Sequence, residues 1–485
     1  MSTVTENFAG EKGLDAARPD PDIVTWDGIN DPANPKNWSA KDKWILTLIL
    51  SIFSLVTLFS PNMTAPALPS VTKDLHITSS PEAALTLSIF MLAYSFGHLI
   101  FAPLSELYGR KPVLQVANIW YLVWNCACGF STTGHQMIAF RFMSGVGASA
   151  TYGISSGVLG DCWHPKDRGK SLAIYNLIPL LGPGLGPILG GVIAQKTTWR
   201  WIFWSTSAFC LALQIVSFMF FRESYAPVIL RRKMKKLRKE TGNDRLHTEF
   251  EGPDQKLLPS LRRSFTRPFI ILFTHPIIQI SSMLSAYGYG VLYITLTSWS
   301  TIWMNRYGLD MSKSGLHYFA LTIGEMLGAQ IGAHVTDWAW RRLQTRGSRG
   351  PEDRLPLIIP GTLIVPTGLL LFGWAAEKKF FWLVVDLGGV LYGIGSMLSG
   401  QVVSAYVIDT YGQYSSSALA GSLVLRSLTA FSFPLFAPAM YRALGFGWAN
   451  TVLALTYLVL AVPISLTLWK FGAKLREGHS IRLEI

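Results

Sequence analysis

Residues 44–64 read WILTLILSIFSLVTLFSPNMT and contain no charged side chain. A helix of about 20 residues rises by about 30 Å, which is the thickness of the hydrocarbon core of a bilayer. Its backbone amides are satisfied within the segment, as a crossing of hydrocarbon requires. The stretch therefore predicts a membrane-spanning helix. Residues 1–43 are polar and net acidic and lack the pattern of a cleavable signal peptide, so we expect the first span to direct insertion.

Runs of the same kind recur along the chain, in which 50% of the residues are hydrophobic and 15% are charged. Soluble proteins carry nearer a quarter charged residues, so this composition argues against a soluble enzyme. The sequence instead predicts an all-α integral membrane protein with twelve transmembrane helices. The expected spans are residues 44–64, 83–104, 112–132, 136–158, 170–195, 199–221, 275–300, 313–335, 355–375, 379–404, 414–440 and 446–470.

The positive charges predict the orientation of these spans. With the N-terminus in the cytoplasm, and with residues at the very ends of spans counted with the adjacent loop or terminus, 32 of the 42 Lys and Arg residues fall in the termini and the even-numbered loops and 8 fall in the odd-numbered loops. Arg141 and Arg426 lie inside spans. This distribution follows the positive-inside rule, so both termini are expected in the cytoplasm. The same placement explains the net charge of +13 without a basic nucleic-acid-binding face on a soluble domain.

The loop at residues 222–274 divides the spans into six and six. We therefore expect an N-terminal six-helix bundle at 44–221 and a C-terminal six-helix bundle at 275–470, with cytoplasmic tails at 1–43 and 471–485. The loop contains the basic block RRKMKKLRK at residues 231–239. We expect this block to form a solvated amphipathic segment on anionic lipid headgroups, with partner binding or regulation as the alternative.

Residues 102–112, between spans two and three, read APLSELYGRKP. Gly109 permits a tight reversal of the chain. The paired basic residues Arg110 and Lys111 follow it, and Glu106 is expected to pair with basic side chains at span ends. Such a pair can hold the two halves together in one state and release them in another.

The corresponding loop of the second half, residues 337–342, reads DWAWRR. It keeps the acid, Asp337, and a basic pair that begins with Arg341, but Trp340 replaces the turn glycine. This degenerate copy supports an internal repeat.

Spans four and five carry two further motifs. Residues 141–147 read RFMSGVG, and the charge of Arg141 within a span is costly unless it faces protein or water. Residues 182–191 read GPGLGPILGG, in which glycines allow close helix approach and prolines set a bend. The residues that define this second motif are Gly182, Pro183, Gly186, Pro187, Gly190 and Gly191.

Four more stretches complete the pattern: WRWIFW at 199–204, ESYAPVIL at 223–230, IDTYG at 408–412, and LR at 425–426 followed by FPLF at 433–436. With the motifs above, the chain from about residue 22 to 474 resembles the major facilitator superfamily and, within it, the fungal twelve-span drug:proton antiporters. Ala102 stands where the family usually has glycine. The resemblance implies the two-bundle major facilitator fold, a link between Arg141 and proton transfer, and an antiporter motif in span five.

The function implied by this resemblance is export of amphiphilic drugs, toxins or secondary metabolites in exchange for protons, by alternating access across a fungal plasma membrane. The expected partners are a small organic substrate, protons and membrane lipids, with no nucleic acid, and the chain is expected to act as a monomer. An uptake symporter for a nutrient and a transporter-like membrane sensor are the alternatives. The span-five motif argues against the symporter.

Ionisable side chains inside apolar runs are candidates for proton coupling. Glu325 lies near the middle of span eight, where burial favours the protonated form of a carboxyl; a structural hydrogen bond is the alternative. His98 in span two, Asp386 in span ten and Asp409 near the cytoplasmic end of that span are further candidates. Packing is the alternative for His98, and solvation near the headgroups is the alternative for the two aspartates. Arg141 serves either proton coupling or helix packing through carbonyl hydrogen bonds.

We expect the substrate cavity at the interface of the two halves, lined by aromatic residues that offer apolar area and a polar tip. Tyr289 and Tyr293 are four residues apart and share one face of span seven, and Tyr94 lies in span two. Arg426 in span eleven either makes a helix contact or binds an anionic substrate.

No competing chemistry is predicted. The four cysteines have neither a metal-ligand spacing nor a disulfide pattern, and no phosphate-binding loop or nucleophile elbow is present. We therefore expect no enzyme activity, no cofactor and no metal.

Overall fold

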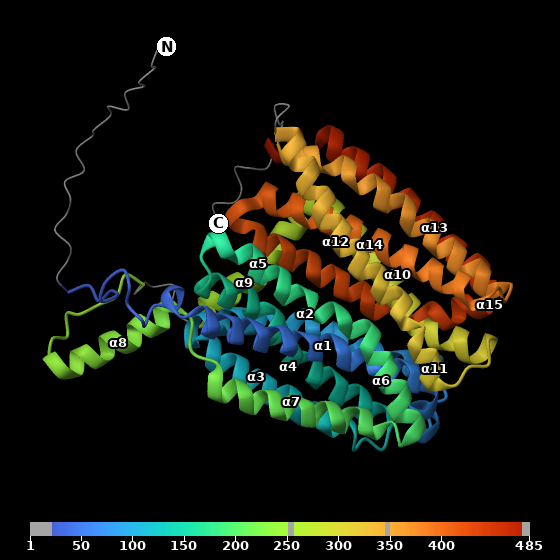
Figure 1. Ribbon diagram of the computed structural model, residues 1–485, viewed down its shortest axis with the longest axis horizontal. Helices are drawn as coiled ribbons and strands as arrows, with labels where there is room; N and C mark the ends of the chain where they lie inside the picture. Colours follow the sequence, from blue (N-terminus) through green and yellow to red (C-terminus); the bar gives the residue numbers. More distant parts are fainter. Residues whose placement is uncertain (1–21, 251–256, 345–349, 478–485) are drawn as a thin grey trace, which may run out of the picture.

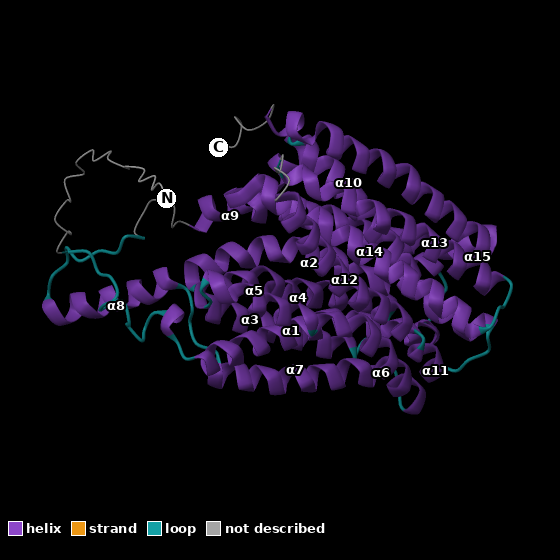
Figure 2. Ribbon diagram, turned by 45° about the horizontal axis from the view of Figure 1, so that its top comes forward, coloured by secondary structure: helices purple, strands orange, loops and turns teal. Residues whose placement is uncertain are grey.

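The computed structural model describes residues 22–250, 257–344 and 350–477, which form helices joined by short loops. Long helices run side by side along one bundle (Figure 1). The described residues contain no strand apart from an isolated bridge between Ile23 and His247 (Figure 2). The expected all-α fold is confirmed.

The two ends of the bundle are distinguished by the chain ends. The described chain begins and ends on the left in Figure 1, and we call this end the terminal face. Helices reach it at Tyr108, Cys162 and Tyr411. The other end, where α6 and α11 lie in Figure 1, is called the opposite face.

The first six spans form one half of the bundle. Side chains cap several of these helices: the Ser39 hydroxyl accepts a hydrogen bond from the amide of Asp42, and the Thr133 hydroxyl accepts one from the amide of Gln136. The elements are α1 (Ala40–Asp74), α2 (Ser80–Tyr108), α3 (Arg110–Cys128), α4 (Gly134–Cys162), α5 (Pro165–Leu177), η2 (Pro179–Leu181), α6 (Gly182–Lys196) and α7 (Arg200–Phe220).

The second half follows two connecting helices, α8 (Ala226–Thr241) and α9 (Leu257–Thr274). Its elements are α10 (Pro276–Thr301), the π-helical turn η4 (Ile302–Arg306), α11 (Met311–Leu316), α12 (Tyr318–Gln344), η5 (Pro351–Leu357), α13 (Ile358–Glu377), α14 (Trp382–Tyr411), η6 (Gly412–Tyr414) and α15 (Ser415–Glu477).

Eight helical segments of the described chain are long and apolar enough to cross a membrane. One of them, Ser417–Arg476, contains two spans, because Gly445 takes a positive φ of 73° and breaks α15. The more polar helices α3, α4 and α12 complete the twelve spans. Their polar residues, such as Asn118, Arg141 and Glu325, are buried in protein rather than exposed to lipid.

Span five departs from the expected continuous helix over 170–195. The chain forms α5, the short turn η2 and then α6. Pro179 begins the turn, and its ring lacks the amide that a continuous helix would need at that position. The glycine-rich motif therefore opens a separate helix.

Two groups of buried side chains form the core. In the first half they come from residues 46–221, and in the second half from residues 271–468. Ala430 of α15 belongs to the first-half core, and Tyr289 and Tyr293 of α10 pack against it. These three residues therefore connect the halves.

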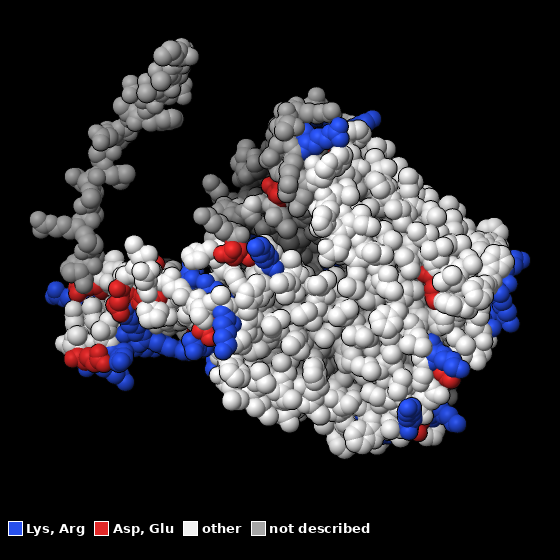
Figure 3. All heavy atoms as spheres, viewed as in Figure 1, with Lys and Arg blue, Asp and Glu red and all other residues white. Residues whose placement is uncertain are grey.

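The outer surface has the character of a membrane protein. Charged side chains gather towards the two ends, and an uncharged band lies between them (Figure 3). On α7, the apolar side chains of Phe209, Leu211 and Ile215 are 50%, 50% and 53% exposed. Contact with lipid explains this exposure without a protein partner.

The basic helix α8 projects from the terminal face (Figure 1). Its apolar side chains Leu230 and Met234 are each 1% exposed, so protein rather than lipid headgroups covers them. Lys233 donates hydrogen bonds to the carbonyl of Thr25 at 2.9 Å and to the carboxylate of Asp27 at 2.5 Å. The N-terminal segment therefore fastens α8 through Lys233. Contact of its other basic residues with lipid headgroups stays a prediction.

Candidate functional site

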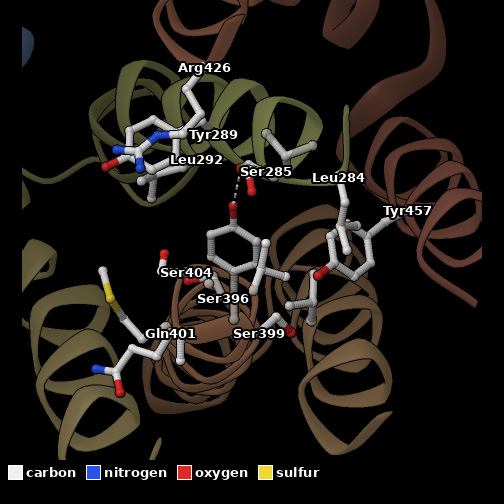
Figure 4. A pocket seen from close by; sticks show the side chains of 18 of the residues that line it. Leu284, Ser285, Tyr289, Leu292, Ser396, Ser399, Gln401, Ser404, Arg426 and Tyr457 are labelled. Carbon is white, nitrogen blue, oxygen red and sulfur yellow. Dashed lines mark hydrogen bonds between the residues drawn. The ribbon is translucent and has the colours of Figure 1, made fainter. Parts of the chain in front are cut away.

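A cavity of about 480 Å³ lies among the helices of the second half. It is lined by residues of α10, α12, η5, α13, α14 and α15 (Figure 4). Hydroxyl groups face it from Ser285 of α10 and from Ser396, Ser399 and Ser404 of α14. The described lining of this cavity comes from residues 284–457, so it lies in the second half and not between the halves, where the substrate cavity is expected.

Arg426 and Tyr289 form one wall of the cavity (Figure 4). The guanidinium carbon of Arg426 lies 3.8 Å from the centroid of the Tyr289 ring, in cation–π contact. The Tyr289 ring stacks in turn on Tyr293, with centroids 6.4 Å apart. Tyr94 of α2 is 8% exposed and lies within electrostatic reach of both tyrosines.

The four residues expected in the substrate cavity are thus neighbours in space, although they come from α2, α10 and α15. Only Tyr289 and Arg426 line the cavity. Tyr293 and Tyr94 extend the aromatic group into the first half. This arrangement brings the cavity wall into contact with the interface between the halves.

The cavity extends towards the terminal face, where Arg354 and Ile408 line it. The Nε of Arg354 lies 2.8 Å from the Oδ2 of Asp409. Asp409, a candidate for proton coupling, is therefore a member of an ion pair at this end of the cavity.

Glu325 of α12 is 2% exposed and lies behind the cavity wall. Its backbone is in close contact with Gly393 of α14, and its carboxyl is within electrostatic reach of Tyr293 and Tyr392. Tyr392 lines the cavity and donates a hydrogen bond to the carbonyl of Gly288 at 3.3 Å. Among the described residues, no basic side chain forms an ion pair with Glu325.

Arg141 is completely buried inside the first half. Its Nε donates to the carbonyl of Thr86 at 3.1 Å, and one terminal nitrogen donates to the carbonyl of Pro61 at 3.4 Å. The rings of Phe90 and Phe203 lie 5.4 Å and 5.6 Å from its guanidinium carbon. The side chain therefore connects α1, α2, α4 and α7, and it does not line the cavity.

His98 also lies apart from the cavity. Its side chain is 5% exposed, and its ring meets Tyr152 of α4 edge to face at 6.5 Å. Both ring nitrogens are buried without a hydrogen-bond partner among the described residues. The structure does not bring His98, Arg141 and Asp409 together into one proton path.

The loop between α2 and α3 is organised differently from the expectation. Glu106 is exposed, and Arg110 instead pairs with Asp161 of α4, with Nε and Oδ2 3.3 Å apart. The Glu223 carboxylate accepts hydrogen bonds from the amides of Arg110 at 2.8 Å and Lys111 at 3.2 Å. A carboxylate at these amides stabilises the N-terminus of α3.

Glu223 also explains Gly109, which has a φ of 104°. A Cβ atom at this glycine would overlap the Glu223 carboxylate. Sequence reasoning singled out the stretch around Glu223 but missed its role, and it missed Asp161 entirely. All these contacts lie within the first half and the start of the loop at 222–274, so in this conformation the motif does not join the two halves.

The second copy of this motif lies in α12. Asp337 and Arg341 belong to that helix, but their side chains lie outside the described part of the structure. The neighbouring Arg342 places its guanidinium carbon 5.2 Å from the ring centroid of Trp338.

The glycine-rich helix α6 is packed on two sides. A Cβ atom at Gly186 or Gly190 would collide with the backbone of α1, and one at Gly182 would lie in tight contact with Leu58. On another side, a Cβ at Gly191 would lie 2.5 Å from the carbonyl oxygen of Met311 in α11. A Cβ at Gly315 of α11 would likewise lie 2.7 Å from the carbonyl oxygen of Pro187. Pro183 lies in the first turn of α6.

Next to this contact, the side-chain oxygen of Gln195 accepts hydrogen bonds from the amide and hydroxyl of Ser312, at 3.0 Å and 2.6 Å. The motif in span five thus brings the two halves together at the opposite face, through backbone shape and neutral hydrogen bonds.

The candidate Asp386 forms a largely buried pair with His317 at the opposite face, and this partner was not predicted. Nδ1 of His317 lies 2.8 Å from Oδ2 of Asp386, and the His317 ring stacks on Trp303 with centroids 3.6 Å apart. The pair joins the turn between α11 and α12, which contains His317, to α14, and η4 packs against it through Trp303. The two ionisable residues are 69 positions apart, so only tertiary structure reveals their contact.

These features define a class of protein. Membrane-spanning helices enclose a cavity lined by hydroxyl, aromatic and guanidinium groups, and two halves meet through close helix contacts at one end. This is the architecture of a solute transporter.

The chain belongs to the Major Facilitator Superfamily, whose family model matches residues 50–430. It is 40% identical to the efflux pump vrtL of Penicillium aethiopicum, over 97% of this chain and 93% of that protein. It is 44% identical to the probable efflux pump mfs2 of Aspergillus flavus, over 85% of this chain and 98% of that protein.

Among solved structures, the partially occluded inward-open xylose transporter XylE of E. coli has the same fold, with a TM-score of 0.66, 16% identity, and coverage of 89% of this chain and 98% of that chain. The resemblance inferred from the motifs is thereby confirmed, and so is the twelve-helix major facilitator fold. The chain is a multi-pass membrane transporter and not an enzyme.

Proposed function

We propose that this protein exports small amphiphilic organic compounds in exchange for protons by alternating access. Full-length similarity to proteins named as efflux pumps supports the direction of transport. The cavity of about 480 Å³ is the observation that carries the proposal, because its volume suits a drug-sized molecule and its lining mixes aromatic and hydroxyl groups.

The same proposal assigns an orientation and a location. The basic residues of α8 lie at the terminal face, and positive charge near a membrane is retained on the cytoplasmic side. We therefore place both termini in the cytoplasm and the transporter in the plasma membrane, where it works as a monomer among lipids. Residues 44–221 and 275–470 are proposed as the two moving bundles, with 222–274 as the linker.

Glu325 is the proposed proton carrier. It is a carboxyl buried between α12 and α14, directly behind the cavity wall, and no described basic residue neutralises it by an ion pair. Opening of the cavity to either side gives its proton a route to water. Arg141 is proposed to preserve the packing of the first half during this cycle, since its described polar contacts are to backbone carbonyls.

The test is transport by purified protein in proteoliposomes, with a panel of fluorescent amphiphiles and an imposed proton gradient. Uphill movement against the proton flow that a protonophore abolishes is the expected result. Movement in the direction of the protons would establish a symporter and overturn the proposal. No movement of any compound under either gradient would also count against export.

Glu325→Gln sharpens this test. The variant should lose proton-driven uphill transport but retain exchange of substrate between the two sides, since the neutral amide imitates the protonated carboxyl. Glu240→Gln, at an exposed position on α8, is the matched control and should transport normally. Normal pH-dependent transport by Glu325→Gln would remove this residue from the mechanism.

A further inference from the structure

The charges that line the cavity all have one sign. The described lining residues include two arginines, Arg354 and Arg426, and no aspartate or glutamate. Arg354 is paired with Asp409 at 2.8 Å, so its charge is balanced within the protein. The charge of Arg426 is therefore the one that no described carboxylate balances at this cavity.

Contacts of Arg426 with the protein are few. Its guanidinium stacks over the Tyr289 ring at 3.8 Å, and its Nε is buried without a hydrogen-bond partner. Arg426 is half-buried, and its cation–π contact offsets only part of the hydration that a cation loses on partial burial. An anion in the cavity would supply the missing interaction through charge-assisted hydrogen bonds.

The buried arginine of the first half provides a contrast. Arg141 donates to two backbone carbonyls and lies between phenylalanine rings; one of its terminal nitrogens is buried without a described partner, and the side chain does not line this cavity. Arg426 has an aromatic ring on one side and the cavity on the other (Figure 4). The same side chain thus serves helix packing in one half and faces open space in the other.

We propose that the cavity selects organic anions, with the carboxylate or phenolate of an aromatic or conjugated acid held at Arg426 and its apolar body among Tyr289, Leu292 and Tyr392. This inference rests on the proposed transport function and names its substrate class. The serines of α14 offer hydroxyl donors for further substituents. Lipophilic cations are disfavoured, because no described lining residue carries a negative charge and Arg426 already covers the Tyr289 ring.

The experiment compares three probes that share one ring system: 2-naphthoate, 2-naphthamide and 2-naphthylmethylammonium. Binding to the full-length protein in detergent at neutral pH is measured by equilibrium dialysis. We expect 2-naphthoate to bind at least tenfold more tightly than either other probe. Arg426→Gln should abolish this preference, and Arg426→Lys should retain part of it because the positive charge remains.

Arg442→Gln is the matched control, because Arg442 is an exposed arginine of the same helix that does not line the cavity. It should keep the tenfold preference for the acid. A thermal melt of each variant shows that the fold is retained. If Arg426→Gln does not fold, the anion selectivity of the cavity is tested by Arg426→Lys and by the relative affinities of the three probes for the native protein.

Three results would overturn the inference: tighter binding of the ammonium probe, an unchanged preference in a folded Arg426→Gln variant, or no saturable binding of 2-naphthoate to the native protein. Binding is measured without a proton gradient. Failure of antiport in proteoliposomes together with selective anion binding would therefore refute the proposed function and leave the anion site in place.

Discussion

The two ends of the bundle are held together by different kinds of contact. At the opposite face, the first and second halves meet through the glycines of α6, the backbone of α11 and the neutral Gln195–Ser312 hydrogen bonds. At the terminal face, charged groups such as Arg110, Asp161 and Glu223 connect helices within the first half. A contact made by shape can separate without leaving a charge unpaired, whereas the charged contacts belong to one half and can persist through the cycle.

The largest effect is expected from locking the opposite face. Cysteines placed at Gln195 and Ser312 and joined by a reducible bifunctional cross-linker should abolish transport, since the halves could no longer separate there. Reduction should restore it. Transport is measured in proteoliposomes before and after cross-linking, with the two single-cysteine variants as controls. Full activity of the cross-linked protein would show that this contact does not open.

The next largest effect is expected at the α1–α6 contact. Gly190→Leu should destabilise the protein by about 3 kcal/mol or more, because its side chain would meet the Met63 backbone, which cannot move aside as a flexible side chain can. Thermal unfolding in detergent measures the change. Gly169→Ala is the control: its site in α5 is open, so the variant should be neutral or slightly stabilised. Equal melting temperatures for both variants would contradict this account of the glycine motif.

A smaller effect on stability is expected at the terminal face, where it distinguishes the observed Arg110–Asp161 pair from the expected pairing of Glu106. Arg110→Gln should cost about 2–4 kcal/mol, since it leaves the partly buried Asp161 without its partner. Glu106→Gln should change the stability by less than about 0.5 kcal/mol, because this side chain is exposed. Denaturation of the two variants in the same detergent tests the comparison, and a greater loss for Glu106→Gln would reverse our assignment.

The smallest effect concerns the N-terminal segment. The amides of Asp27 and Ala33 donate to the Asp31 carboxylate and lower its pKa below the usual 3.8. Because the folded pKa is depressed, this stabilisation is complete above the unfolded pKa and is lost as the pH falls through the folded value. At neutral pH, Asp31→Asn should loosen the segment by about 1 kcal/mol.

Hydrogen exchange of α8 amides measures this loosening, with Thr25→Ala as the control because only its main-chain carbonyl contacts Lys233. Exchange in Asp31→Asn that matches the native protein would show that the carboxylate does not fasten the segment.

The sequence was sufficient for the fold because lipid imposes a simple rule: each crossing needs a long apolar helix. The break at Gly445 fell within the predicted gap between spans eleven and twelve, where the apolar run is interrupted. The break at Pro179 was not predicted, since the residues around it are as apolar as the rest of span five. Hydropathy locates a span but does not describe its internal geometry.

The site was less predictable, for a physical reason. Arg426, Tyr289 and Tyr293 could be identified because a polar group inside a span costs free energy unless it has a partner, and such groups therefore mark candidate sites. Their partners could not, because pairs such as Arg110–Asp161 and His317–Asp386 join residues 51 and 69 positions apart. The position of the cavity within the second half likewise depends on how side chains fill the space between helices, which no local pattern records.

The fastening of α8 limits how far the two halves can travel from each other. The chain is anchored by the N-terminal segment as far as His247, whose amide donates to the carbonyl of Asp22 at 2.8 Å, and it resumes at α9, which begins at Leu257. The connection between these points is residues 248–256, so His247 and Leu257 are at most about 35 Å apart when this stretch is fully extended. Residues 248–256 therefore set a maximum distance between the anchored α8 segment and α9. Shortening this stretch should restrict the movement of the two halves relative to each other before it affects the folding of either half.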